Sequence, residues 1–181
     1  MLQSNFSALI DDRPEENLFR IHRRIYTDQD VFDAEMERIF EQSWTYVCHE
    51  SQIPKPGDYY SVKLGREPVL INRRDDGSVG GLLNACAHRG ALLNPTQRGN
   101  ARILVCRYHG WSFAANDGRC VKIKDPFGED PACYALRKVA RVESYKGFVF
   151  ATVNEAAPSL VEHLGAASTI VDMLAEQSDQ G

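Results

Sequence analysis

Apolar residues recur at helical spacing in one early stretch of the chain, "DVFDAEMERIFEQSW" at residues 30–44. The apolar side of this stretch is formed by Val31, Phe32, Met36, Ile39 and Phe40. Thr27 or Asp28 is placed to cap its first turn, because either side chain accepts backbone N–H bonds. The pattern predicts a helix over 28–42 whose apolar face belongs to a core or a domain interface. The polar residues 1–26 show no sustained period and predict an irregular arm.

From residue 44 the pattern changes to short apolar segments that are rich in β-branched and aromatic residues. The segments are "SWTYVC", "YYSVKL", "PVLINR", "VGGLLN", "ARILVC", "RCVKIK", "RKVARV" and "GFVFATV". Asp76-Gly77 and Asp117-Gly118 supply hairpin turns between them. Short strands at this spacing, without helices in between, predict a mainly β fold, an antiparallel sandwich or barrel.

The end of the chain returns to helical spacing. The apolar positions are Leu160, Val161, Leu164, Ile170, Val171, Met173 and Leu174. They predict one or two helices, with a break at Leu164-Gly165. The chain therefore divides into an N-terminal arm and helix at 1–43, a β region at 44–157 and a helical tail at 158–181.

Composition narrows the class of protein. The 181 residues are 43% hydrophobic and 25% charged with a net charge of −4, which is typical of a globular protein and disfavours nucleic-acid binding. No apolar run reaches the ~18 residues of a membrane span, and the N-terminus lacks the pattern of a secretory signal. Five cysteines at irregular spacing fit a reducing compartment. We therefore expect a soluble, cytoplasmic protein without a membrane partner.

Two cysteine–histidine pairs are the strongest candidates for chemistry. Cys86 and His88 lie in "CAHRG", and Cys106 and His109 lie in "CRYHGW". Each pair directly follows a predicted strand, so both lie on loops that adjacent strands of one sheet could bring together. We expect the two loops to form one site with two thiolates and two imidazoles.

This donor set favours a metal. Two thiolates suit one iron and two neutral imidazoles suit a second, as in a [2Fe–2S] centre where two histidines replace two cysteines. The same four side chains could also form a Cys2His2 zinc site. Gly90 and Gly110, which follow the histidines, suit both sites because glycine permits unusual backbone angles and a close approach to sulfur. The residues alone leave both metals open.

At these loops the sequence resembles the Rieske proteins, in particular the large subunit of bacterial aromatic-ring-hydroxylating dioxygenases. "CAHRGA" and "CRYHGW" are similar to that family's cluster-binding loops. The segments "DRPEENLFR", "HESQIPKPGDYY", "LINRRDDG", "KDPFG" and "KVARVESYKGFVFATVNE" are similar to the benzoate, toluate and anthranilate dioxygenase branch. The likeness runs from about residue 11 to the end of the chain.

The resemblance implies a Rieske-type antiparallel β-sandwich at 44–157 and a role for each loop residue. Cys86 and Cys106 hold the inner iron of a [2Fe–2S] cluster, and His88 and His109 hold the outer iron. The residues expected to position the loops and to set solvent access and potential are Arg89, Gly90, Tyr108, Gly110 and Trp111.

The resemblance also implies partners. A flavin and iron–sulfur reductase donates single electrons, and the cluster passes them to a mononuclear non-haem Fe(II) for O₂-dependent cis-dihydroxylation of an aromatic acid. Family members form trimers of alpha subunits, in which one cluster approaches a neighbour's catalytic iron, often with a small beta subunit.

Two departures refine the expectation. Ala91 and Tyr108 stand where respiratory Rieske proteins carry bridging cysteines, which indicates the soluble oxygenase kind. His22, His49 and His163 lack the family's iron-binding motif, so we expect the mononuclear iron in a catalytic domain to which the tail at 158–181 leads.

A stand-alone Rieske ferredoxin and a zinc-stabilised binding module remain alternatives. We expect Cys48, His49 and Glu50 to be structural and not metal ligands, and we expect Cys120 and Cys133 to be free thiols.

Overall fold

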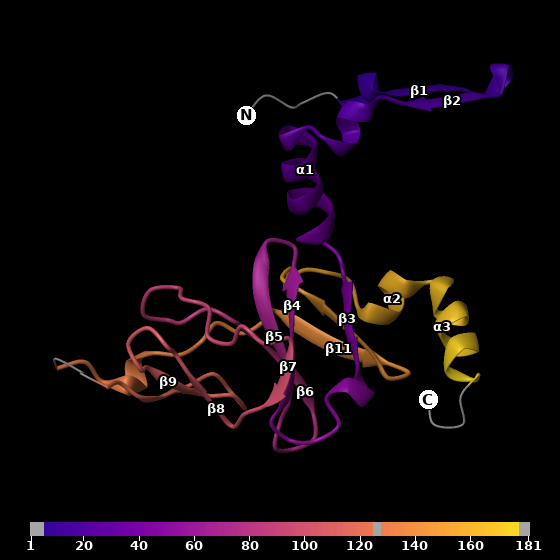
Figure 1. The fold of residues 1–181 in the computed structure, drawn as a ribbon. Coiled ribbons are helices and arrows are strands. Elements are labelled where there is room, and N and C mark those ends of the chain that lie inside the picture. Colours follow the sequence, from indigo (N-terminus) through magenta and orange to yellow (C-terminus); the bar gives the residue numbers. More distant parts are fainter. Residues whose placement is uncertain (1–5, 125–127, 178–181) are drawn as a thin grey trace.

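The computed structural model describes residues 6–124 and 128–177, and Figure 1 shows their arrangement. The described chain is mainly antiparallel β, with short helices at both ends, which confirms the predicted fold class. Most of the "KDPFG" segment and the end of the predicted tail lie outside the described residues.

A four-stranded sheet in the order β6-β5-β4-β7 forms the centre of the fold. Its strands are β4 (Asp58–Leu64), β5 (Glu67–Arg73), β6 (Val79–Leu83) and β7 (Arg98–Asn100). Val69, Leu70 and Ile71 on β5 are all fully buried. A strand covered on both faces needs an unbroken apolar run, which explains why "PVLINR" does not alternate.

One face of this sheet packs on a three-stranded sheet in the order β11-β12-β3. Its strands are β3 (Thr45–His49), β11 (Arg141–Tyr145) and β12 (Phe148–Thr152). The core between the two sheets includes Val69 and Ile71 from β5 and Val149 and Ala151 from β12. These two sheets form the sandwich.

The other face packs on the lobe that carries the cysteine–histidine loops. Its sheet, ordered β10-β9-β8, consists of β8 (Ile103–Val105), β9 (Ser112–Ala114) and β10 (Cys120–Lys122). Leu70, Leu104, Phe113 and the two loop cysteines, Cys86 and Cys106, belong to one core cluster. A short 3-10 helix, Pro131–Cys133, follows this sheet. The loops are therefore anchored in a core of their own.

The prediction of an irregular arm over residues 1–26 is wrong for the part that the structure describes. Strands β1 (Ile10–Arg13) and β2 (Leu18–Ile21) pair as an antiparallel hairpin that stands away from the sheets (Figure 1). Short 3-10 helices precede, connect and follow the two strands, at Phe6–Leu9, Pro14–Glu16 and Arg23–Tyr26. The strands are four residues long and largely exposed, so alternation is too brief to read from sequence.

The predicted helix begins as expected but does not bury its apolar face. Asp28 caps α1 (Gln29–Glu35) by accepting from the Asp30 N–H, and a π-helical segment continues at Met36–Phe40. Of the apolar positions, only Val31 is buried, whereas Ile39 is 53% exposed. The expected packing into a core is therefore absent from the described residues, and the expectation of a domain interface stays a prediction.

One predicted strand, "RKVARV", is displaced. The strand β11 begins only at Arg141, and the preceding residues run along the edge of β6. The N–H of Val139 donates to the Gly81 carbonyl, and the N–H of Leu83 donates to the Arg137 carbonyl. Val139 in this segment is buried in the core between the two sheets. The segment therefore pairs with the edge of β6 before β11 begins.

The predicted tail consists of two helices, α2 (Leu160–Leu164) and α3 (Ala167–Ala175), with the expected break at Gly165. Leu160 is buried, but Ile170 and Met173 are about three-fifths exposed, at 62% and 59%. Across 6–124 and 128–177, no helix has the length and apolar character needed to cross a bilayer.

Candidate metal centre

The two cysteine–histidine loops share one backbone design. In the first, the Cys86 N–H donates to the Ala91 carbonyl at 2.9 Å, and the Gly90 N–H donates to the Cys86 carbonyl at 2.8 Å. In the second, the Cys106 N–H donates to the Trp111 carbonyl at 2.8 Å, and the Gly110 N–H donates to the Cys106 carbonyl at 2.9 Å. In each loop, therefore, the cysteine is hydrogen-bonded through its backbone to the residues four and five positions later.

Both loops need glycine at the fifth position. Gly90 has φ +68° and Gly110 has φ +74°, which is the left-handed region that residues with a Cβ rarely adopt. The predicted use of these two glycines for unusual backbone angles is confirmed.

The structure brings the two thiols together in the interior. Cys86 and Cys106 are 4% and 2% exposed, and their side chains interact with each other. Burial raises the pKa of the Cys86 thiol, while the backbone N–H groups of His88 and Arg89 act in the opposite direction. These inward N–H groups favour a thiolate, which is the form that binds metal.

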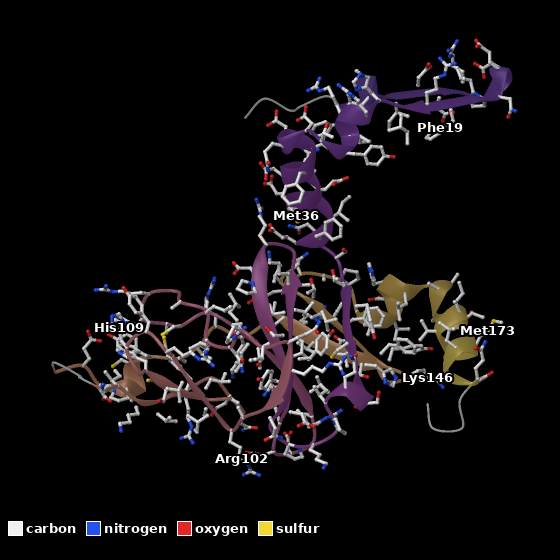
Figure 2. The ribbon with its side chains drawn as sticks, in the orientation of Figure 1. Phe19, Met36, Arg102, His109, Lys146 and Met173 are labelled. Carbon is white, nitrogen blue, oxygen red and sulfur yellow. The ribbon has the colours of Figure 1, made fainter. Side chains whose placement is uncertain are left out.

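The two imidazoles meet at the surface. The ring centroids of His88 and His109 are 4.8 Å apart, and both side chains are exposed. Figure 2 shows His109 at the outer end of the β8–β9 lobe, far from helices α2 and α3. The site thus has a buried sulfur end and an exposed nitrogen end.

Aromatic rings support the histidines. Trp111 is buried and stacks on His88 with a centroid distance of 4.8 Å and an interplanar angle of 7°. Tyr108 is 63% exposed and its ring lies 3.9 Å from that of His109. Trp111 and Tyr108 thus make the ring contacts that a supporting role requires, whereas within residues 6–124 and 128–177 no contact of the Arg89 side chain supports such a role.

Asn84, at the base of the first loop, is a supporting residue that the sequence did not indicate. Its amide donates to the Asn94 carbonyl at 2.7 Å and to the Ser61 hydroxyl at 2.9 Å, and its oxygen accepts from the Asn94 N–H at 2.9 Å. The side chain is 1% exposed. A polar residue at the end of the apolar run "VGGLLN" was the only sign of it.

The remaining candidates have structural surroundings. Cys48 is buried in the sandwich core, His49 caps a 3-10 helix at Glu50–Gln52, and Glu50 pairs with Arg73 at 2.8 Å. That these three residues are not metal ligands stays a prediction.

The two other cysteines and the two other histidines lie outside the two loops in sequence. Cys120 and Cys133 are free, and Cys133 is exposed. His22 caps a 3-10 helix and His163 lies exposed on α2.

The donors fit a two-metal cluster better than a single ion. Within the described ranges, no three or more His, Cys, Asp or Glu side chains are grouped so as to hold one metal ion. The cysteines pair with each other inside, and the histidines pair with each other outside. Such pairs suit two irons bridged by sulfide, each with two protein ligands, whereas zinc needs four donors converging on one point.

This fold and this site define a small β domain that holds a mixed sulfur- and nitrogen-ligated iron–sulfur cluster. Residues 43–145 match the family model for the Rieske [2Fe-2S] domain, and the chain belongs to that family. The predicted cluster, and not zinc, is the cofactor that defines the family.

The relatives are oxygenase subunits. Toluate 1,2-dioxygenase subunit alpha of Pseudomonas putida is 40% identical over 181 residues, which cover 96% of this chain and 40% of that protein. Anthranilate 1,2-dioxygenase large subunit of Acinetobacter baylyi is 39% identical over 185 residues, which cover 99% of this chain and 39% of that protein. The chain thus spans about two-fifths of these relatives' length.

Solved structures agree on the fold. Naphthalene 1,2-dioxygenase from Rhodococcus sp., bound to indole, superposes with a TM-score of 0.80 at 33% identity, over 89% of this chain and 38% of that chain. A quaternary ammonium Rieske monooxygenase, whose structure is described as giving insights into inter-subunit electron transfer, has a TM-score of 0.73 at 30% identity, over 83% of this chain and 42% of that chain.

Proposed function

We propose that the chain is the electron-transfer domain of the large subunit of an aromatic-ring-hydroxylating dioxygenase. In this proposal Cys86 and Cys106 hold one iron of a [2Fe–2S] cluster, and His88 and His109 hold the other. The observation that carries the proposal is the pairing of donors, with thiols inside and imidazoles outside, on two loops of identical closure. When bound, the cluster supplies a centre that is reduced and reoxidised one electron at a time.

Different residues of the protein shape the two ends of such a site. The buried cysteines keep the sulfur end away from water, and Trp111 covers the inner face of His88. The exposed histidines place the other end at the surface, where a partner can approach. Because the hydrophobic shell around a cluster controls solvent access and potential, this asymmetry suits electron exchange with a docked protein.

Partners and substrate follow from the relatives. We assign a flavin and iron–sulfur reductase as electron donor, a catalytic domain with a mononuclear non-haem Fe(II), neighbouring alpha subunits and a small beta subunit. The substrate class is an aromatic acid, because relatives named for toluate and anthranilate match almost the whole chain. We place the protein in the cytoplasm, because a reducing compartment suits two ligand cysteines and three thiols that form no disulfide.

The division of the chain belongs to the same proposal. Residues 1–43 form the arm and helix, residues 44–157 the cluster domain, and residues 158–181 the tail toward the catalytic domain. The exposed apolar side chains of the arm and the tail, such as Phe19 and Met173, support their use as contact surfaces in the whole protein (Figure 2).

Spectroscopy and metal analysis test the cluster. Purified protein should contain iron and acid-labile sulfide, and after reduction it should give the electron paramagnetic resonance of a mixed nitrogen- and sulfur-ligated cluster. His88→Ala and His109→Ala should each abolish that resonance, while the control His163→Ala, on an exposed helix, should leave it unchanged. Zinc without iron, or an unchanged resonance in both loop variants, would refute the assignment.

A separate assay tests the reaction. The whole gene product, supplied with a matched reductase, a reduced nicotinamide as two-electron donor and O₂, should convert benzoate, toluate or anthranilate, with one reduced nicotinamide and one O₂ consumed per substrate molecule. A protein that contains the cluster but acts on none of these acids would leave the cluster assignment intact and reject the substrate class.

A further inference from the structure

A chain of aromatic contacts leads from a cluster-binding histidine into a neighbouring segment. His88 stacks on Trp111, and Trp111 in turn contacts Tyr134. The ring centroids of Trp111 and Tyr134 are 4.8 Å apart, with an interplanar angle of 71°. Phe113 also approaches Trp111, but its centroid is 6.5 Å away. Of the rings beyond the histidine, Tyr134 therefore makes the closer contact with the indole.

Tyr134 is fixed by its backbone as well as by its hydroxyl. It ends the 3-10 helix Pro131–Cys133, where its N–H donates to the Pro131 carbonyl at 3.0 Å. Its carbonyl accepts from the Cys120 N–H at 3.0 Å, which ties it to β10. The hydroxyl donates to the carboxylate of Glu129. The backbone and the hydroxyl group of Tyr134 are thus both held by hydrogen bonds, independently of the contact with Trp111.

Tyr134 also contacts both the core around the two cysteines and a hollow at the surface. The ring packs against the buried group that includes Cys86, Cys106 and Trp111. On its outer side lies a surface hollow of about 410 Å³, and the walls of this hollow include Cys86, Gly90 and Tyr134 itself. Removing the ring would enlarge this hollow, which already reaches Cys86, and bring water closer to the core around the two cysteines.

We propose that Tyr134, anchored by Glu129, is a positioning residue that fixes the Trp111 indole and, through the stack, the ring plane of His88. The inference rests on the proposed function, since its effect is exerted on a histidine that holds the cluster. An edge-to-face aromatic contact of this kind is directional, so it favours one orientation of the indole.

The inference predicts two changes in Tyr134→Leu. Loss of the ring frees the indole, so the nitrogen hyperfine coupling of one of the two histidines should change. Water that reaches the cluster should stabilise the negative charge added on reduction, so the midpoint potential should rise. We expect at least a threefold change in the reduction equilibrium, or roughly 28 mV, because a tenfold change in a one-electron equilibrium corresponds to about 59 mV.

The experiment uses the cluster-loaded chain, reduced, with pulsed electron paramagnetic resonance and a redox titration. Tyr134→Phe keeps the ring and should restore both values toward the wild type. Tyr46→Leu is the matched control, because Tyr46 also contacts two aromatic rings but lies on β3, away from the loops. Tyr134→Met, whose unbranched and flexible side chain adapts to irregular space, serves if the leucine variant does not fold.

The outcomes separate the two proposals. A wild-type protein without an iron–sulfur resonance would overturn the proposed function. A wild-type resonance together with unchanged coupling and potential in Tyr134→Leu or Tyr134→Met would overturn this inference alone. Equal shifts in the Tyr46→Leu control would also overturn it, because the effect would then not pass through Trp111.

Discussion

Replacing Asn84 tests whether the first cluster-binding loop is held at its base. The side chain is 1% exposed and makes three hydrogen bonds, two of them with the backbone of Asn94 on the far side of the loop. Asn84→Ala removes all three and leaves the N–H and carbonyl of Asn94 without this partner. We expect the first loop to lose its anchor while the second loop is unaffected.

The magnitude follows from the hydrogen bonds. Each intramolecular bond contributes about 0.5–1.5 kcal/mol net, and a buried group left unpaired costs about as much or more. Three lost bonds therefore predict that Asn84→Ala lowers the free energy of unfolding by about 2–4 kcal/mol. The matched control is Asn100→Ala, whose amide also makes two hydrogen bonds but is exposed, and it should cost less than about 1 kcal/mol.

Asn84→Asp adds a pH dependence of known sign. The carboxyl is buried beside the Asn94 carbonyl, so burial should raise its pKa in the folded state above the ordinary value. The folded state then holds the proton more tightly than the unfolded state does. Stability should be greatest below the ordinary pKa of an aspartate and should fall as the pH rises toward the raised folded value.

The assay is urea unfolding followed by circular dichroism, together with iron content per chain. The alanine variant should show a lower midpoint at unchanged slope and less iron than the Asn100→Ala control. If Asn84→Ala and Asn100→Ala have equal midpoints, the three bonds do not hold the loop. If the aspartate variant is equally stable from pH 4 to pH 8, the site is not buried.

Three further predictions concern other parts of the chain. Gly110→Ala should lower the free energy of unfolding by about 1–2 kcal/mol, measured by the same unfolding assay, because a Cβ is strained at φ +74°; an unchanged midpoint would contradict the loop geometry. The hydrogen bond from Ser144, together with the nearby guanidinium of Arg73, lowers the pKa of Glu50. The stability that ionised Glu50 provides should therefore be lost as the pH falls below the ordinary carboxyl range. Glu50→Gln should reduce the dependence of unfolding on pH in that range. In the native protein the exposed Cys133 should react with a thiol reagent at once. Cys48 is 1% exposed and burial raises its pKa to about 11, so it should react only after unfolding. Equal reaction rates for the two thiols would contradict the burial of Cys48.

The cluster-binding loops could be predicted from the sequence because their chemistry and geometry are local. The spacing of Cys86, His88, Cys106 and His109 indicates the proposed donors, and each glycine marks the turn that its own loop needs. The same holds for Asp28, whose capping bond spans only two residues. Features set within a few residues of chain were accessible from the sequence.

Features that depend on distant partners were not accessible. The start of β11 at Arg141 is decided by the edge of β6, on which residues 137–140 lie first. Asn84 looks like an ordinary strand residue until Asn94 and Ser61 are placed beside it. The contact of Tyr134 with Trp111 joins segments 23 residues apart, and no periodicity reports it.

The shared closure of the two loops has a consequence for how such a site can vary. The hydrogen bonds from Cys86 to Ala91 and from Cys106 to Trp111 span the same number of residues, although the histidine stands at a different place within each loop. The backbone hydrogen bonds therefore fix the number of residues in each loop but not the identity of the side chains between them. Inserting or deleting one residue breaks these bonds, so in evolution and in engineering these loops should change by substitution and not by length.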